Sequence, residues 1–223
     1  MKNIVLALDT TSSPLLLAFE YDGKVYSVKK SGIKQEELLF PALKKLFAKA
    51  GVSLTDVKKV FFLRGPGRFT GIRISITLAS MLRSLAGAEA ASMTVFEFLD
   101  FQIKRTRAFK KWHKENPSGV HAVVLHAFRE EYFLQFFDGS LPMWLTKEEM
   151  LEKLREYAQP LYISGFDKEK SSLKTLLAGF TVADDKDCKI NTKVFCAAAA
   201  KKNFEQNSLE PLYLKPARFE LGK

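Results

Sequence analysis

The stretch RGPGRFTGIRISITLA, residues 64–79, places three glycines and a proline within seven residues and continues as an almost uncharged apolar run. A predicted buried strand, DVKKVFFL, precedes it, and helical spacing of apolar residues follows it to about Gly87. The loop lacks the Gly-Lys-Ser/Thr ending of a Walker loop. Two hypotheses remain: the turn only starts the helix, or its free backbone N–H groups bind an anion. The residues of that anion site would be Gly65, Gly67, Arg68, Thr70 and Arg73.

The rest of the chain predicts two similar series of elements, each beginning with strands and continuing with alternating helices and strands. The sequence therefore predicts a duplicated α/β fold, with one lobe at residues 1–103 and another at 104–223. The last helix and the C-terminal tail are expected to pack back on the first lobe. Residues 92–102 fit a strand or a helix. Strands are expected at residues 3–11, 14–30 (a hairpin turning at 22–23), 56–65, 120–128, 130–139 and 160–166, and helices at 35–51, 72–87, 146–158, 171–179 and 193–206.

The composition is that of a folded basic protein. Of 223 residues 47% are hydrophobic, and 35 Lys and Arg against 25 Asp and Glu give a net charge of +10. Such a balance favours acidic partners, but a solvated basic surface explains it equally well. The two cysteines have no metal-like spacing, and no apolar run approaches the roughly 20 residues of a membrane helix. We expect a soluble cytoplasmic protein without a membrane segment.

The helix after the glycine loop has too much apolar surface for one sheet. On a helical wheel its apolar arc covers roughly 200°, about twice that of an ordinary surface helix. One explanation is a central position in a large core; the other is an interface with a second protein. The expected anchors of that interface, on this helix and the preceding one, are Leu39, Leu43, Phe47, Ile74, Leu78, Met81 and Leu85.

The segment KRTRAFKKWHK, residues 104–114, carries six of the positive charges and no acid. Phe109 and Trp112 are interleaved with them. Contact with an RNA phosphate backbone and a solvated helix face with aromatic anchors are both compatible with this pattern. The residues of such an RNA contact would be Lys104, Arg105, Arg107, Lys110, Lys111 and Lys114.

Three motifs together carry a family resemblance: LALDTTSSPLLLAF at the N-terminus, RGPGRFTGIRI in the middle and EPLYLKP near the C-terminus. With these motifs in this order, the chain resembles the TsaB/YeaZ family over nearly its whole length. The resemblance implies a duplicated fold of the actin/sugar-kinase/Hsp70 (ASKHA) class, with a mixed sheet flanked by helices in each lobe. It also implies a non-catalytic subunit of the bacterial complex that makes threonylcarbamoyl-adenosine at position 37 of certain tRNAs.

The same resemblance implies the partners. The chain would pair with the catalytic homologue TsaD through its first two long helices and self-associate through the same surface. A TsaE-like ATPase is a further expected partner, and tRNA would be reached through the complex. No cofactor is expected on the chain itself, and ATP, ADP or Mg²⁺ would be confined to the partner interface.

Four positions depart from the family pattern. Gln35 stands where a His is frequent at the start of the first helix, Arg68 where Ser is usual in the loop, and His126 and Phe128 where the second lobe usually opens with Asp and Arg. Any site built on these residues, and the choice of partner, is therefore open to change.

The sequence offers few residues in an arrangement suited to catalysis or metal binding. No histidine precedes His113, and His121 and His126 are five apart in a predicted strand, so they point to opposite faces and cannot easily share a metal. Asp9 follows the first strand, where an acid either caps a turn or handles metal-bound phosphate. We expect no metal site and no catalytic residue. The alternatives are a kinase-like or peptidase-like enzyme of the same fold and a direct tRNA-binding module.

Overall fold

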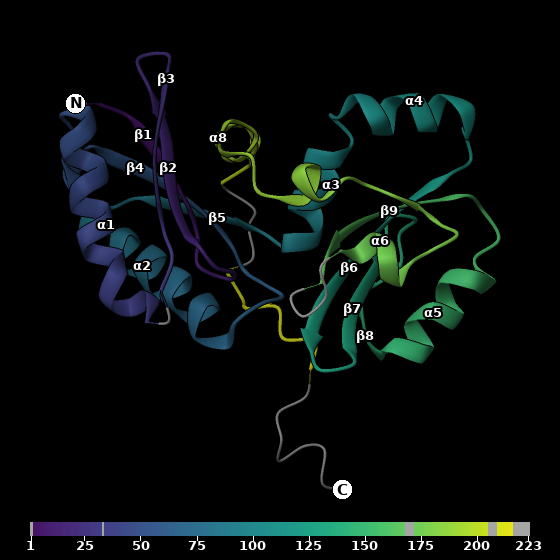
Figure 1. Ribbon diagram of the computed structural model, residues 1–223. Coiled ribbons are helices and arrows are strands. Elements are labelled where there is room, and N and C mark those ends of the chain that lie inside the picture. Colours follow the sequence, from purple (N-terminus) through teal and green to yellow (C-terminus); the bar gives the residue numbers. More distant parts are fainter. Residues whose placement is uncertain (1, 33, 168–171, 205–208, 216–223) are drawn as a thin grey trace, which may run out of the picture. The chain divides into compact units, whose positions relative to one another are not determined.

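The computed structural model describes all residues except 1, 33, 168–171, 205–208 and 216–223. The chain separates into two compact units (Figure 1). The first comprises Met1–Phe98 and Asn191–Leu212, and the second comprises Leu99–Ile190 and Tyr213–Lys223. The sequence predicts a boundary after residue 103, at the end of the helix α3 (Val95–Ile103), whereas the units divide inside that helix, between Phe98 and Leu99.

The first unit is built on a five-stranded sheet in the order β3-β2-β1-β4-β5. β1 pairs antiparallel with β2 and parallel with β4, so the sheet is mixed. The predicted hairpin is confirmed: Asp22 and Gly23 both have positive φ at the turn between β2 and β3. The elements of this unit are β1 Ile4–Asp9, β2 Leu15–Tyr21, β3 Lys24–Lys30, α1 Gln35–Ala50, the 3-10 turn Leu54–Asp56, β4 Val57–Leu63, α2 Phe69–Ala86, β5 Glu89–Met93 and α8 Thr192–Lys201.

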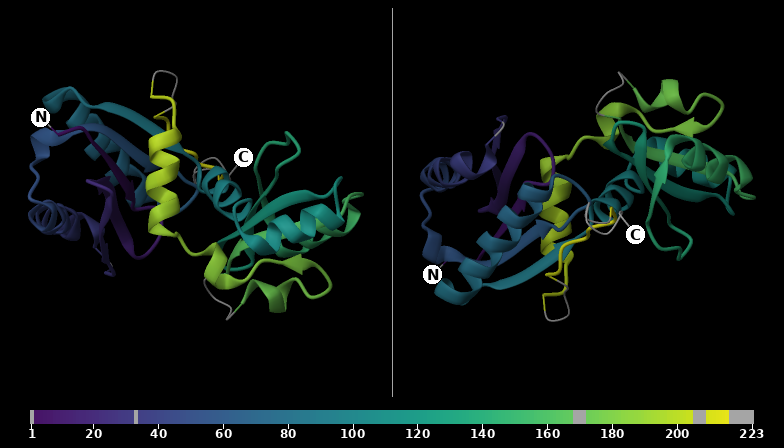
Figure 2. Two further views of the ribbon diagram at one scale, coloured as in Figure 1. Left: turned by 90° about the horizontal axis from the view of Figure 1, so that it is seen from above. Right: turned by 90° about the horizontal axis from the view of Figure 1, so that it is seen from below.

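Helices cover both faces of this sheet (Figures 1 and 2). α1 and α2 share one core with the side chains of one face, and α8 contacts β1, β2 and β3. Phe195 of α8 packs edge-on against Phe61 of β4 and Phe98 of α3, with ring centroids 5.4 and 5.2 Å away. The two long helices end where the sequence predicts, because Gly51 and Gly87 take the left-handed conformation that stops a helix.

The second unit carries another five-stranded sheet, in the order β10-β9-β6-β7-β8. The sequence TKEE, residues 146–149, predicts a capping box. It is confirmed, since the Thr146 hydroxyl accepts from the Glu149 N–H and the Glu149 carboxylate accepts from the Thr146 N–H. The elements are α4 Arg107–Glu115, β6 Val120–Phe128, β7 Glu131–Phe136, β8 Met143–Thr146, α5 Lys147–Glu156, β9 Leu161–Phe166, α6 Leu173–Leu176, β10 Thr181–Val182 and α7 Asp185–Cys188.

The two sheets have the same topology. In each, the first three strands form an antiparallel meander, and the fourth and fifth add in parallel on the other side of the first strand. The predicted duplication is therefore confirmed. The ambiguous residues 92–102 divide: β5 ends at Met93 and α3 begins at Val95. The strands β8 and β10 and the helix α7 were not expected from the sequence.

Two separate apolar clusters hold the second unit together. One packs α5 and α6 on the sheet, with Met150 and Leu154 among its buried members. The other joins α3, α4 and α7 to β9 and includes Phe109 and Tyr162. None of the helices among the described residues is long and apolar enough to cross a membrane.

Candidate functional site

The glycine loop packs against the turn that follows β1. The N–H of Arg68 donates to the carbonyl of Thr11 at 2.8 Å, and the hydroxyl of Thr10 donates to the carbonyl of Gly71. A Cβ at Gly67 would lie 2.5 Å from the Thr11 oxygen, and one at Gly71 would lie 1.8 Å from the Thr10 oxygen. Both glycines are thus required by close backbone approach within this chain.

These contacts favour the turn hypothesis over the anion hypothesis for this loop. The Arg68 N–H already has a backbone acceptor, and a Cβ at Gly65 would meet the carbonyl of Leu212 at 2.7 Å. The guanidinium of Arg73 lies over the Phe69 ring, 3.9 Å from its centroid, and Thr70 is exposed. Binding of an anion by these residues stays a prediction.

The turn itself is held by a network of polar contacts around Asp9. The buried carboxylate of Asp9 accepts from the N–H and hydroxyl of Thr11, at 2.8 and 2.6 Å, and from the hydroxyl of Ser12 at 2.8 Å. Gln35, the residue in place of the family's histidine, is also buried and donates to the carbonyl of Ser12 at 2.6 Å. An acid whose oxygens bond its own turn acts as a cap. Gln35 ties the start of α1 to the same turn.

The predicted partner interface divides between core and surface. Leu39, Leu43, Phe47 and Leu78 are at most 8% exposed and belong to the core cluster of the first unit. Little of their surface is left for a partner, so their role as interface anchors stays a prediction. Leu78 is buried because it borders the side of α2 that packs on the sheet, which carries Ser75, Ala79 and Leu82.

The remaining three residues do lie at the surface. Leu85 is 81% exposed, Met81 is 37% exposed and Ile74 is half-buried. With the exposed Thr70 and Thr77 they follow one side of α2 at intervals of three and four residues. We call this set of five residues the α2 face.

Two exposed aromatic residues were missed at the sequence level. Phe40 on α1 is 58% exposed, and Phe69 at the start of α2 is 52% exposed. Phe40 directly follows the buried Leu39, and Phe69 is the first residue of α2. A wheel centred on the buried stripe of α1 places Phe40 at its edge, and this signal was available.

The basic segment also divides. Lys104 pairs with Asp100 at 2.8 Å, and the Arg105 guanidinium stacks on Phe101 and bonds its carbonyl. The other four basic residues lie at positions i, i+3, i+4 and i+7 of α4, so they share one exposed side of the helix. No acidic partner is present for them within the described residues. We call them the α4 face: Arg107, Lys110, Lys111 and Lys114.

A polar relay lies under α4. The buried His121 of β6 bonds Asp100 through Nδ1 at 2.7 Å and Ser164 of β9 through Nε2 at 2.8 Å. Burial lowers the pKa of His121 below its usual 6.5, although Asp100 acts in the opposite direction. The order of groups is that of a hydrolase triad, but Ser164 is fully buried, so its oxygen has no access to a substrate. The relay joins α3, β6 and β9.

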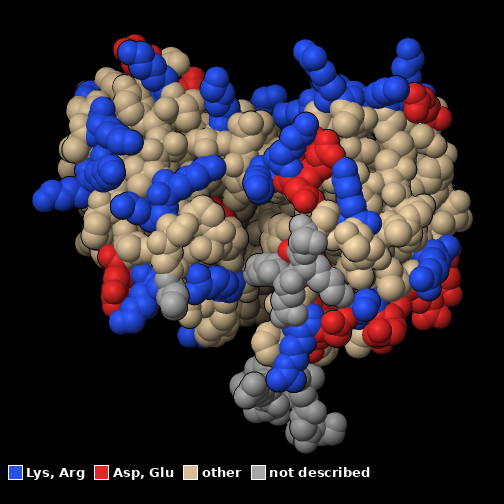
Figure 3. Space-filling view, in the orientation of Figure 1, with Lys and Arg blue, Asp and Glu red and all other residues tan. Residues whose placement is uncertain are grey.

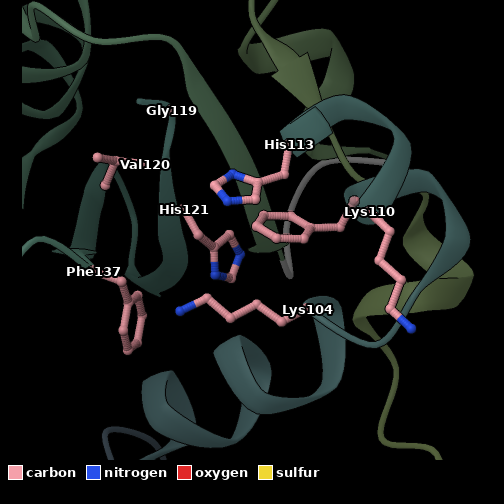
Figure 4. A pocket seen from close by; sticks show the side chains of 8 residues that line it. Lys104, Lys110, His113, Gly119, Val120, His121 and Phe137 are labelled. Carbon is pink, nitrogen blue, oxygen red and sulfur yellow. The ribbon is translucent and has the colours of Figure 1, made fainter. Parts of the chain in front are cut away.

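An open cavity of about 470 Å³ lies beside this relay. Three of its lining residues, Phe109, Lys110 and His113, come from α4. Figure 4 shows His113 and His121 turned toward one another and the Lys104 ammonium between His121 and Phe137. The lining residues are Lys104, Phe109, Lys110, His113, Gly119, Val120, His121 and Phe137.

The histidines of β6 lie on opposite faces, as predicted. His126 packs edge-on against Tyr132 in the α5 cluster, and its Nε2 bonds the carbonyl of Arg129 at 2.7 Å. Phe128, the other departure from the family pattern here, is 53% exposed. Among the described residues no three His, Cys, Asp or Glu side chains are grouped to hold a metal ion. Burial raises the thiol pKa of Cys188 and of Cys196 to about 11.

Comparison with known proteins gives matches over most of the chain. The TsaB protein of Bacillus subtilis (strain 168), named a tRNA threonylcarbamoyladenosine biosynthesis protein, is 30% identical over 73% of this chain and 71% of its own length. The chain belongs to the TsaB family. The TsaB protein of Buchnera aphidicola from Schizaphis graminum is 27% identical over 70% of this chain and 71% of its own length.

Two further comparisons give matches to a family model and to a solved structure. Residues 31–97, which include α1 and α2, match the family model of TsaD, tRNA N6-adenosine threonylcarbamoyltransferase. The solved structure of YeaZ from Pseudomonas aeruginosa superposes with a TM-score of 0.65 at 20% identity, covering 96% of this chain and 100% of that one. This likeness concerns the fold alone, and it agrees with the two five-stranded sheets of repeated topology described above.

Proposed function

We propose that this chain is a non-catalytic subunit of the apparatus that makes threonylcarbamoyl-adenosine at position 37 of tRNA. In this proposal it pairs with a TsaD-like catalytic subunit through the α2 face, with Phe40 and Phe69 at its borders. The supporting observation is Leu85, which is 81% exposed on a helix whose opposite side is fully packed. Membership of the TsaB family supports the pathway.

The physical argument concerns exposed apolar area. Removing such area from water contributes roughly 25 cal/mol per Å², and the costs of association offset part of this contribution. Clustered apolar residues on a surface helix that also carries polar ones are typical of protein interfaces. Because the four buried anchors predicted from the sequence are occupied in the core, partner contact falls on Ile74, Met81 and Leu85.

The proposal also includes features that follow from the family. The chain acts in the cytoplasm, forms a homodimer through the same face when alone, and has a TsaE-like ATPase as a further partner. The chain alone carries no cofactor, and ATP, ADP or Mg²⁺ is confined to the partner interface. The closed hydrogen bonding of Asp9 supports a structural rather than a phosphate-handling role for that carboxylate.

Pairing is tested by co-purification with the TsaD-like protein of the same genome, followed by size-exclusion chromatography with light scattering. We expect the double variant Met81→Asp/Leu85→Asp to lose the complex and remain folded, because both side chains are exposed. The matched control is Leu141→Asp, since Leu141 is also 81% exposed but lies in the second unit. Retention of the complex by the double variant would overturn the interface assignment.

The non-catalytic assignment has its own test. Isothermal titration calorimetry of the isolated chain with ATP and Mg²⁺ is expected to show no binding. Tight binding together with ATP turnover that is lost in Asp9→Asn would instead identify a kinase-like enzyme.

A further inference from the structure

The α4 face is an unusual concentration of uncompensated charge. Its four cations occupy nine residues of helix, and Glu115 is the single acid of that helix. By contrast, α5 in the same unit mixes three basic residues with four acids over ten residues. Figure 3 shows the resulting difference: Lys and Arg side chains project from the region of α4, while Asp and Glu gather around α5.

The α4 face is also held in a fixed position. On the opposite side of the helix, Phe109 packs edge-on against Tyr162 at 5.2 Å and against His121 at 5.7 Å. Trp112 packs against Tyr162 at 5.2 Å. The N-terminus is capped by the Thr106 hydroxyl, which accepts from the Phe109 N–H. A rigid row of cations loses little conformational freedom of the helix when it binds a polyanion.

The cavity adjoins this row and adds a different chemistry. Lys110 belongs to both the α4 face and the cavity lining, and His113 on the next turn stacks on Phe109 at 5.6 Å while staying exposed. The cavity volume of about 470 Å³ falls within the roughly 300–1,000 Å³ of small-molecule sites. Cations along a groove with stacking rings beside them are the recurrent chemistry of single-stranded RNA sites.

We propose that α4 binds RNA directly: its four cations contact successive phosphates of an unpaired segment, and the cavity takes one base against His113. The choice of tRNA as that RNA rests on the proposed function. The site itself rests on the charge, the fixed helix and the cavity. This proposal differs from the expectation that the chain reaches tRNA only as part of the assembled complex. Here the isolated chain would bind RNA by itself.

The phosphate contact is tested by fluorescence anisotropy of the full chain with a labelled tRNA transcript at 50 mM salt. We expect Arg107→Glu/Lys111→Glu to weaken binding at least tenfold and to reduce the salt slope by about two phosphate contacts. The control Lys147→Glu/Lys153→Glu makes the same charge change on α5 and is expected to weaken binding less than about threefold. Equal losses in both variants, or no binding by the wild type, would overturn the proposal.

The base contact is tested with His113→Ala. This variant is expected to bind the unpaired RNA about tenfold more weakly, since one stacked base is lost, and to bind a duplex of equal length as the wild type does. Equal weakening toward both RNAs would overturn the base site. The result is separable from the pairing proposal, because Met81→Asp/Leu85→Asp should retain RNA binding and Arg107→Glu/Lys111→Glu should retain pairing.

Discussion

α2 and α4 are both surface helices with one well-packed side, yet they leave opposite kinds of side chain exposed. α2 exposes Met81 and Leu85, and α4 exposes a row of cations. Burial of an exposed apolar side chain against a partner lowers the free energy of the complex. This stabilisation requires direct contact. Exposed charges act at longer range and are screened by salt. The two helices are therefore suited to partners of different chemistry.

The two helices are also held in different ways. The start of α2 is fixed by backbone approach, with Gly67 and Gly71 against Thr10 and Thr11. α4 is fixed by side chains, mainly the rings of Phe109 and Trp112. A backbone contact tolerates no added atom, whereas packed rings can adjust. Substitutions at the two anchors should differ accordingly.

The largest effect is expected from Gly71→Val. Its Cβ would lie 1.8 Å from the carbonyl oxygen of Thr10, so the backbone of α2 or of the β1 turn must move. We expect a loss of about 3 kcal/mol or more in the free energy of unfolding, measured by urea denaturation. The control Gly87→Ala meets open space and should cost about 1 kcal/mol through its positive φ alone. Equal losses would mean that the close approach does not hold α2.

The next effect separates the two sides of α2. Leu78→Ala is expected to cost about 3 kcal/mol in the free energy of unfolding, because Leu78 is 3% exposed in the core. Leu85→Ala should change it by less than about 0.5 kcal/mol, since that side chain is 81% exposed. In pairing, Leu85→Ala should weaken the complex with the TsaD-like subunit. A stable Leu78→Ala protein would show that the helix is rotated relative to the described packing.

A smaller effect is expected from salt, which should weaken RNA binding by the α4 face more than pairing through the α2 face. For four phosphate contacts with unpaired RNA, a rise from 50 to 200 mM salt should weaken binding about fiftyfold. Pairing through the α2 face should change less than about threefold, because apolar burial is little screened. Both are measured on the same preparation, by anisotropy and by analytical ultracentrifugation. A steep salt dependence of pairing would mean that charges, not Met81 and Leu85, dominate that interface.

The sequence predicted the repeated fold because its signals are local. The hairpin at residues 22–23, the glycine stops of α1 and α2 and the Thr146 capping box each depend on a few neighbouring residues. The short strands β8 and β10 escaped detection, since four and two residues carry no periodicity. They exist because sheet neighbours pair with them.

The sites were less predictable for a related reason. A helical wheel shows which residues are apolar but not where the sheet lies, so Leu78 was assigned to the surface although it is buried. The relay joins Asp100 to His121, 21 positions apart, and His121 to Ser164, 43 positions apart. No local sequence pattern indicates such contacts. The basic row of α4 was visible in the sequence, but its missing acidic partners required the structure.

The smallest effect concerns the pH dependence of stability and originates at His121, the buried histidine that packs against Phe109 of α4. Burial lowers the pKa of His121 in the folded chain below 6.5, so the unfolded chain binds its proton first as pH falls. Stability is thus complete above about pH 6.5 and is lost progressively as pH falls below it. His121→Gln should be less stable overall but should lack this slope between pH 7 and 5.5, in urea denaturation at each pH. If wild type and variant show the same slope, His121 is not the titrating group beneath α4.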